Sequence, residues 1–343
     1  MVNKLLKYAF LTAFFCIYFC ISAFKATNST HHNVLYTITG YAQGTSYSIQ
    51  YLSQSALVHK NEIDSIFKVL DDNFSLYSKA SLISDFNQSL RGIRITPHLR
   101  HVITASKQIH MQTDGSFDVA ILNLLSLWGK GKKGIDIKPS ADEIRKALSF
   151  SGSQHISVHG DSLLKSNPSI RIDCDGIAQG YSVDVMASFL DTYQISNYLV
   201  EIGGEVKSKG FNVHGKPWRI GYTTASSLQT FSANYPTLHL SGWACTTSGR
   251  LSKYSGSDTN KLSHIINPKS GLPVDNGLVS VTVIAKDAMT ADAYDNAFMV
   301  LGIEKTLALL KENTTLGVHF VYEPKPGQLK DTANSFFKLF IAD

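Results

Sequence analysis

Two carboxylates and one amide are spaced to share a helix face in the last quarter of the chain. Asp292, Asp295 and Asn296 stand at positions i, i+3 and i+4, and such positions lie on one face of an α-helix. Carboxylates so close together repel each other unless a cation lies between them. Oxygen ligands without cysteine or histidine suit Mg²⁺ or Ca²⁺ better than zinc or copper. The pattern therefore predicts a hard-cation site; the alternative is a solvated acidic helix face, or an Asp that caps the helix start.

Two strand-to-helix turns are expected to position this chemistry. Leu278–Ala285 has strand character and leads into Ala288–Leu301, which has helix character and carries the three residues. Upstream, a strand over 170–173 leads through a glycine-containing turn at 173–180 into a helix that ends near Tyr193. Backbone N–H groups and the dipole at a helix start attract anions. The second turn is therefore a candidate anion site, with a plain strand-to-helix turn as the alternative.

Two loops carry further functional groups. The segment 245–249, Cys-Thr-Thr-Ser-Gly, is expected to be a loop that offers hydroxyls to phosphate or ribose oxygens. The segment 263–268 is expected to be a short strand running into a turn, and it carries His264. An imidazole with a pKa near ~6.5 suits general-base work, while the alternative is a histidine hydrogen-bonded at a strand edge. Five other histidines are expected at the surface: His31, His32, His98, His101 and His110.

Hairpins and helices are mixed along the rest of the chain without regular βαβ alternation. This mixture favours an α+β fold with a mixed, largely antiparallel sheet and packed helices. The segment 129–134 matches G-x-G-x-x-G, but it follows no clear strand and opens no apolar helix, so a surface loop is expected. Strands are expected at 34–41, 45–51, 155–159, 198–202, 205–209, 218–222, 237–240, 317–322 and 335–341, and helices at 57–74, 84–87, 97–112, 140–148 and 304–312.

Bulk composition limits the function classes. The chain has 343 residues, of which 43% are hydrophobic, and this is enough for a large core in a globular protein. The net charge is +5, and the basic residues are scattered apart from a short cluster at 130–133. No nucleic-acid-binding surface is therefore expected, although a mildly basic protein suits an anionic small substrate.

The N-terminus predicts export. Lys4 and Lys7 precede an uncharged apolar run at 8–24, which Lys25 closes. The run is longer than the ~7–15 residues of a signal-peptide core and slightly shorter than the ~20 of a spanning helix. We expect residues 1–27 to be an export signal, either cleaved or retained as a membrane anchor, and residues 28–33 to be a linker. The rest of the chain would then lie outside the cytoplasm.

The cysteines fit this organisation without forming a disulfide framework. Cys16 and Cys20 lie in the export segment, where lipid attachment is less expected because a large residue precedes each. Cys174 and Cys245 are the two that remain in the folded part, and we expect two buried thiols rather than a bond between them.

Eight short stretches follow one another in a recognisable order. They are 42–45, 75–78, 115–118 with 127–129, 173–180 with Tyr181 and Asp184, 198–204, 247–249, 264–268 with Gly271, and 279–296. In this order they resemble the ApbE family, the FAD:protein FMN transferases, and the resemblance covers roughly residues 40–310.

The resemblance implies a fold, a reaction and a compartment. The fold would be a single T-fold-like ApbE domain over 34–343. FAD would be cleaved at its pyrophosphate, FMN would pass to a Ser or Thr hydroxyl of an acceptor protein through a phosphodiester bond, and AMP would leave. The acceptors of such families are subunits of membrane redox complexes and related flavin-carrying domains. The reaction would take place on the periplasmic side of the inner membrane.

The family pattern also implies roles for individual residues. Asp292, Asp295 and Asn296 would bind Mg²⁺ together with a backbone carbonyl near Gly176, and His264 would handle a proton or contact phosphate. The flavin nucleotide would contact Gln43, Tyr77, Ser116, Phe117, Asp118, Asp173, Gln179 and Ile266.

Four of these positions depart from the family pattern. Gln43 stands where Met is frequent, Ser116 where Ala is common, and Asn296 where Thr is more usual. Gln179 stands where Lys or Glu is common. Losing a Lys there removes a cation near the phosphates, so phosphate stabilisation would depend more on the metal.

Two other functions compete with transfer. In a Mg²⁺-dependent FAD pyrophosphatase, water would replace the protein hydroxyl and the products would be free FMN and AMP. An exported flavin-binding protein without catalysis is the second alternative. The intact set of Asp292, Asp295 and Asn296 argues against a pure binder, which would need no metal.

Overall fold

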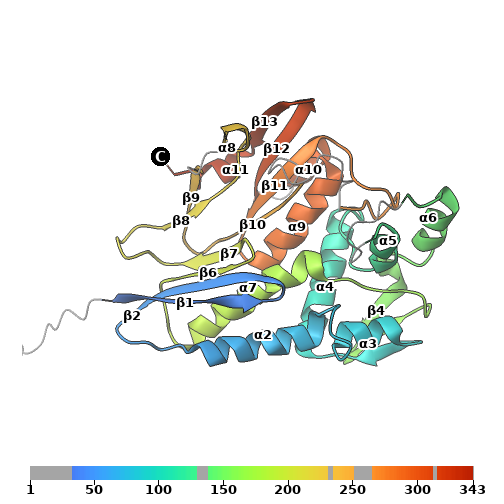
Figure 1. Ribbon diagram of the computed structural model, residues 1–343, viewed down its shortest axis with the longest axis horizontal. Helices are drawn as coiled ribbons and strands as arrows, with labels where there is room; N and C mark the ends of the chain where they lie inside the picture. The colour runs from blue at the N-terminus through green and yellow to red at the C-terminus, as the bar shows by residue number, and fades with distance from the viewer. Residues whose placement is uncertain (1–32, 130–137, 231–234, 251–264, 312–314, 343) are drawn as a thin grey trace, which may run out of the picture.

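An eight-stranded sheet runs through the molecule, and every neighbouring pair of its strands is antiparallel (Figure 1). The computed structural model describes residues 33–129, 138–230, 235–250, 265–311 and 315–342. In spatial order the strands are β1 (Val34–Ala42), β2 (Thr45–Ser53), β6 (Tyr198–Ile202), β7 (Glu205–Lys209), β10 (Ala244–Gly249), β11 (Leu278–Ala285), β12 (Gly317–Lys325) and β13 (Gln328–Ala333).

Helices and two smaller sheets complete the described part, which confirms the α+β class. The small sheets contain β3 (Gly92–Arg94), β5 (Ser162–Lys165) and β4 (Ile156–His159), and β8 (Trp218–Gly221) with β9 (Thr237–Leu240). The helices are α2 (Lys60–Phe74), α3 (Leu82–Gln88), α4 (Pro97–Gln112), α5 (Leu122–Leu127), α6 (Ala141–Leu148), η1 (Ser153–His155), α7 (Asp175–Thr192), α8 (Ala225–Thr230), α9 (Ala288–Leu301), α10 (Ile303–Leu310) and α11 (Ser335–Lys338).

Local sequence signals explain where these elements begin. Gln43 and Gly44 both have positive φ, 52° and 78°, which is the backbone of a two-residue type I′ turn between β1 and β2. The Thr96 side chain accepts from the Leu99 N–H, and Pro97 opens α4. The Asp287 side chain caps α9 by accepting from the Thr290 N–H at 2.8 Å. The helix cap is therefore Asp287, which leaves the acidic residues farther along α9 available for another role.

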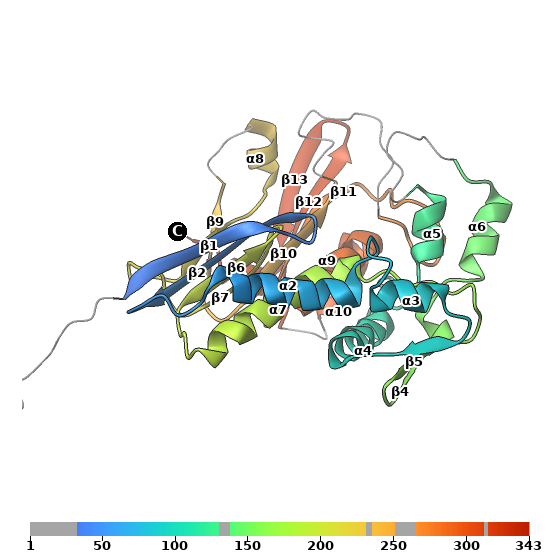
Figure 2. The same ribbon diagram turned by 60° about the horizontal axis from the view of Figure 1, so that its bottom comes forward.

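Helices α7 and α9 pack against each other and against the sheet, and they hold the centre of the fold (Figure 2). The Asp184 carboxylate of α7 accepts from the Ala288 and Met289 N–H groups at 3.0 and 2.8 Å. It also accepts from Lys207 Nζ at 2.7 Å. One buried side chain thus fixes the start of α9 to α7 and to strand β7.

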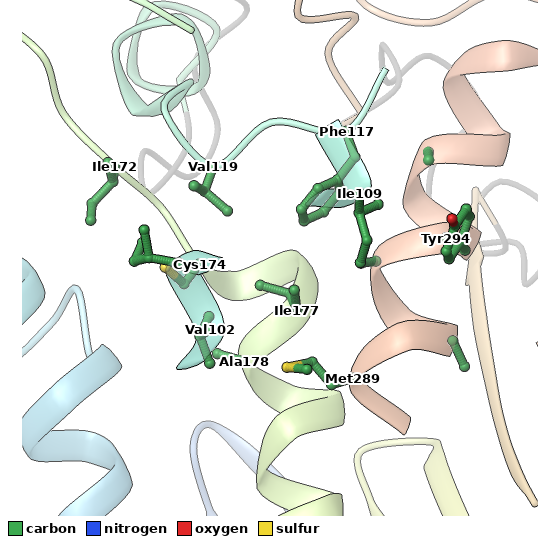
Figure 3. Close-up of a cluster of buried hydrophobic side chains, with 14 of the residues drawn as sticks. Val102, Ile109, Phe117, Val119, Ile172, Cys174, Ile177, Ala178, Met289 and Tyr294 are labelled. Carbon is green, nitrogen blue, oxygen red and sulfur yellow. The ribbon is translucent and has the colours of Figure 1, made fainter. Parts of the chain in front are cut away.

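A hydrophobic cluster lies beneath the turn that opens α7. Figure 3 shows Val102 of α4, Ile177 of α7 and Met289 of α9 pointing toward one another in this cluster. A Cβ at Gly180 would lie 2.3 Å from the Ala288 carbonyl oxygen, so only glycine permits the close approach of the two helices. Cys174 and Cys245 are both buried free thiols, as expected.

Most expected elements are confirmed, and three expectations are wrong. The segment expected as a small-residue loop is β10, which pairs with β7 and β11 while α9 packs on it, where small side chains are needed. The expected strand at 335–341 begins as α11, because the Asn334 side chain accepts from the Phe337 N–H. The segment 170–173 is not a regular strand; the Asn87 side-chain amide bonds both polar groups of the Ile172 backbone.

The predicted export segment and most of the predicted linker lie outside the described residues. The same is true of His264, of His31 and His32, and of 130–134 in the G-x-G-x-x-G match. Among the helices that are described, none combines the length and the apolar character needed to cross a membrane.

Candidate active site

The predicted metal residues lie together where α9 passes the start of α7. Asp292 Oδ2 accepts from the Gly180 N–H at 2.9 Å. Asn296 Nδ2 donates to Asp292 Oδ1 at 3.2 Å and to the Gly176 carbonyl at 3.4 Å. Asp292 and Asp295 are 4% and 1% exposed, so α9 does not present a solvated acidic face here. The four groups chosen from the sequence thus lie together where the middle of α9 passes the first turn of α7.

The Asn296 amide indicates how a cation would fit. Its Nδ2 donates to three oxygens: the Asp292 backbone carbonyl, Asp292 Oδ1 and the Gly176 carbonyl. Its Oδ1 accepts from the Ser248 hydroxyl at 3.2 Å. An amide N–H group that faces several oxygens offsets their mutual repulsion, as a cation would. The orientation of an Asn amide is set by the surrounding hydrogen-bond network. Rotating the amide would turn Oδ1 toward the same oxygens and complete a ligand set suited to Mg²⁺.

Burial controls the electrostatics of this site. Desolvation raises the pKa of Asp292 to about 7, and it raises the pKa of Asp295 well above its ordinary value, with the charge of Asp292 adding to the effect. Asp295 Oδ1 is buried without a hydrogen-bond partner among the described residues. Glu205 faces the same pocket, and its pKa rises to about 9 through burial and then through the charge of Asp292. A bound cation would stabilise the ionised form of each of these carboxyls.

The donor set is mixed rather than purely acidic. Within the ranges that the structure describes, no group of three or more His, Cys, Asp and Glu side chains is arranged to hold a metal ion. The predicted set instead combines two carboxylates with an amide oxygen and a backbone carbonyl. Mg²⁺ commonly uses only one or two protein carboxylates and completes its octahedron with water and substrate phosphate. The residues present therefore fit this ion.

A pocket of about 470 Å³ opens beside these groups. It brings together five of the predicted nucleotide residues with the predicted metal residues, and the end of β10 lines it as well. The five nucleotide residues are Ser116, Phe117, Asp118, Asp173 and Ile266.

The other three predicted nucleotide residues line an adjoining pocket of about 540 Å³. Gln43, Tyr77 and Gln179 lie there, and Asp175 borders both pockets. The Tyr77 side chain is 86% exposed at the rim, where a ring could stack on a planar ligand. The two pockets therefore meet at Asp175.

Gln179 is held by the sheet. Its Nε2 donates to Glu205 Oε2 at 2.5 Å and to the Ile202 carbonyl at 3.0 Å. The amide therefore occupies the partner position that a lysine would use to neutralise Glu205. Gln179 therefore supplies no charge from this position.

Asp118 organises the loop that forms one wall of the pocket. Its carboxylate accepts from the Ala120 N–H, from the Ser153 N–H and hydroxyl, and from His110 Nδ1 at 3.1 Å. Burial alone would raise the pKa of Asp118, but hydrogen bonds from His110 and Ser153 outweigh it and hold the pKa below its usual value. These four partners use the acceptor capacity of the carboxylate.

The expectation that His110 is a surface residue is wrong. Its ring is largely buried against Asp118, and the hydrogen bond to that carboxylate raises the pKa of His110. His98 is also only partly exposed and bonds the Tyr181 hydroxyl at 2.8 Å. Glu205 was missed altogether by sequence reasoning. An acidic residue directly after the Gly203-Gly204 pair was the signal that could have identified it.

Comparison with known proteins gives a consistent result. The family model described as "ApbE family" matches residues 43–320. An FAD:protein FMN transferase of Vibrio cholerae is 34% identical over 312 residues, which are 89% of this chain and 92% of that protein. An FAD:protein FMN transferase of Escherichia coli K12 is 34% identical over 259 residues, 74% of this chain and 73% of that protein.

Solved structures agree with this. The flavin transferase ApbE from Vibrio cholerae superposes with a TM-score of 0.81 at 32% identity, covering 90% of this chain and 100% of that one. The apo form of the flavinyl transferase ApbE of Pseudomonas stutzeri gives 0.81 at 31% identity, covering 90% and 97%. Sequence, fold and the arrangement of the pocket lead to one conclusion: the chain belongs to the ApbE family.

Proposed function

We propose that the protein is a Mg²⁺-dependent FAD:protein FMN transferase. The oxygen of an acceptor Ser or Thr attacks the phosphorus of the FMN half of FAD. The bond from that phosphorus to the bridging oxygen breaks, AMP leaves with the electron pair, and the hydroxyl proton goes to a base or to solvent. The relatives at 34% identity carry the same activity in their names, which supports this reaction for the chain.

The observation that carries the proposal is the buried oxygen cluster on α9 and α7. Asp292, Asp295, Asn296 and the Gly176 carbonyl would hold Mg²⁺, which would act as a Lewis acid on the pyrophosphate. Asp295 Oδ1 has no hydrogen-bond partner among the described residues, and a cation would supply one.

The other residues bind and orient the substrate. Phe117 and Ile266 are buried and supply an apolar wall, while Asp118 holds the loop that follows Phe117 in place. The hydroxyls of Thr247 and Ser248 line the same pocket and can donate to phosphate oxygens. His264 stays our candidate for the base, on the strength of its motif alone.

A labelling experiment tests the function. The purified protein is incubated with FAD, Mg²⁺ and a flavin-carrying domain of a membrane redox complex, and the acceptor is examined for covalent flavin fluorescence. Labelling supports transfer, whereas free FMN and AMP without labelling would identify a pyrophosphatase. Asp292→Ala tests the metal: if this variant labels the acceptor at the wild-type rate in limiting Mg²⁺, the site assignment is wrong.

Export and membrane association belong to the same proposal. Lys4, Lys7 and the apolar run at 8–24 support an exported protein that works on the periplasmic side of the inner membrane, secreted or anchored. The intact mass of the mature protein tests this, because cleavage, lipidation and a retained segment give three different masses. An unprocessed protein in the cytoplasmic fraction would contradict it.

A further inference from the structure

Among the described residues, strand β1 is an edge strand without the usual protection. In the part of the chain that the structure describes, β1 pairs with β2 alone, over nine residues and without a register shift. Its sequence, Val-Leu-Tyr-Thr-Ile-Thr-Gly-Tyr-Ala, contains neither charge nor proline. Proteins normally protect an exposed edge with charges, proline, bulges or short strands, because unpaired backbone groups recruit another strand.

The opposite edge of the same sheet is protected. Strand β13 carries Lys330 and Asp331, and its pairing with β12 contains a register shift. Asp331 also accepts from the Ala225 N–H of α8 at 2.9 Å, which places α8 against this edge. The absence of such features on β1 is therefore a property of that strand and not of the sheet as a whole.

The free edge leads directly to the candidate active site. The turn that ends β1, Gln43-Gly44, lines the outer pocket together with Asp175 and Gln179. Strand β2 begins at Thr45, and a Cβ at Gly203 would contact both Thr45 and the Gln179 amide, so this end of the hairpin lies close to the site. Figures 1 and 2 show β1 on the outer side of the sheet, with the hairpin tip turned toward the middle of the molecule where α7 and α9 lie.

The register identifies the backbone groups that are available. A two-residue type I′ turn makes Ala42 and Thr45 a hydrogen-bonded pair, and the pattern then alternates along the antiparallel ladder. The N–H and C=O groups of Leu35, Thr37, Thr39 and Tyr41 consequently point away from β2. The side chains of these four residues are exposed, and Tyr41 is 74% exposed.

We propose that β1 is the docking strand for the acceptor: an extended, uncharged segment of the acceptor protein adds to the free edge of β1 and presents its Ser or Thr hydroxyl at the Gln43 turn. This inference rests on the proposed transferase function, which requires a second protein beside the pocket that FAD fills. Main-chain hydrogen bonds to an edge strand supply affinity with little sequence demand. An uncharged segment fits because its side chains would lie beside Leu35, Thr37, Thr39 and Tyr41, none of which is charged.

Substitutions on the two edges test the docking. Thr37→Lys puts a charge on the free edge, and Thr39→Pro removes an outward N–H without removing a bond to β2. The probe is a purified flavin-carrying domain of a membrane redox complex. We expect kcat/KM for this domain to fall at least tenfold in both variants, while the Kd for FAD stays at the wild-type value. Thr332→Lys on β13 is the charge-matched control and should label normally.

Amide hydrogen exchange gives an independent result. When the same domain is added, exchange should slow at Leu35, Thr37, Thr39 and Tyr41, whose alternating neighbours already bond β2. Wild-type labelling by both edge variants, or protection confined to other surfaces, would overturn the proposal. The β1 amides could also be protected from exchange without the domain and lose that protection on dilution. This result would overturn the proposal, because a second copy of the chain would then cover the edge. If the wild-type protein transfers no FMN at all, the proposed function fails, and the exchange pattern still decides the docking.

Discussion

The orientation of the Asn296 side-chain amide determines whether the oxygen cluster is bridged by hydrogen bonds or could bind a cation. In the described structure Asn296 Nδ2 satisfies Asp292 and the Gly176 carbonyl, and a metal would require the amide oxygen in its place. A Thr, which the resemblance to the ApbE family leads us to expect at this position, would offer one neutral oxygen but no N–H to take the place of the cation. The Asn296 amide therefore gives hydrogen bonds to the same oxygens that would bind the cation.

Replacing this amide should weaken metal binding more than it weakens turnover. Asn296→Ala removes one neutral ligand, and we expect the Mg²⁺ concentration for half-maximal transfer to rise about 10-fold, the lower end of ligand-shell effects. Saturating Mg²⁺ should restore most of the rate because Asp292 and Asp295 remain. Asn296→Thr is the matched control and should stay near the wild-type value. An unchanged Mg²⁺ titration for the alanine variant would exclude Asn296 from the ligand set.

His110 should make the stability of the loop at Asp118 depend on pH. The pKa of His110 is raised by Asp118, so near neutral pH the folded state binds more protons than the unfolded state. This contribution is complete below the unfolded pKa of about 6.5 and is lost as the pH rises through the higher folded value. His110→Gln should lower the free energy of unfolding by about 1–3 kcal/mol at pH 6 and by less at pH 8.5. Urea denaturation at the two pH values measures the difference, and equal losses would contradict the pairing.

At the scale of elements, the metal site depends on how α9 is held. Asp184 joins the first N–H groups of α9 to Lys207 on β7, although none of these atoms lies in the candidate ligand set. Burial is the largest influence on this carboxyl and raises its pKa, whereas the charge of Lys207 lowers it. A displacement of the start of α9 would move Asp292, which is four residues farther along.

Asp184→Ala should therefore disturb both stability and metal binding. We expect a loss of about 2–4 kcal/mol in the free energy of unfolding, because two helix N–H groups and a half-buried lysine lose their partner. The Mg²⁺ requirement should rise as well. Asp191→Ala is the control on the same helix, since its ion pair with Lys209 is exposed and should change stability by less than about 0.5 kcal/mol. Equal effects of the two variants would show that the buried contact has no special role.

The elements that could be predicted are those whose signals are local. Strand β11 and the following helix α9, which carries Asp292, were predictable because an apolar run is followed by a capped helix-forming segment. That Asp292, Asp295 and Asn296 would lie close together was predictable, because their spacing matches helix geometry. Strand β10 was not predictable as a strand, because Cys-Thr-Thr-Ser-Gly is dictated by the packing of α9 and not by propensity. Helix α11 was missed because Phe336 and Phe337 favour a strand and the Asn334 cap is a single residue.

The residues that were missed depend on contacts between distant segments. His110 meets Asp118 only because a tight turn with Asp114 and Gly115 at positive φ folds the chain back on α4. Glu205 reaches the pocket because β7 lies beside β10 in the sheet, and its neighbour Gln179 comes from α7. No spacing in the sequence encodes either pair.

At the scale of the whole molecule, one sheet serves two purposes. Its central strands β7, β10 and β11 support α9 and the buried carboxyls, while β1 at its edge ends beside the adjoining pocket lined by Gln43 and Gln179. The nucleotide site and the proposed acceptor edge thus share a single rigid support. Such an arrangement favours a fixed distance between the phosphorus and the incoming hydroxyl, which is the main requirement of phosphoryl transfer.

The buried carboxyls should make the stability of the whole protein depend on pH and Mg²⁺ together. Burial raises the pKa of Asp292 to about 7 and of Glu205 to about 9, so the metal-free folded state holds protons that the unfolded state releases near pH 4. Stability of the metal-free protein should therefore fall as the pH rises from about 4 to about 9. Mg²⁺ favours the ionised carboxyls, so its stabilising effect should grow over the same range.

Thermal unfolding in EDTA and in excess Mg²⁺ measures this linkage. We expect the difference in Tm between the two conditions to be small at pH 5 and to reach several degrees at pH 8, because a tenfold change in an ionisation constant corresponds to about 1.4 kcal/mol. Asp295→Asn removes one buried carboxyl, so its metal-free form should be more stable than the wild type at pH 8 and should gain less from Mg²⁺. Equal Tm differences at the two pH values, together with a destabilised metal-free Asp295→Asn, would mean that no cation occupies this site.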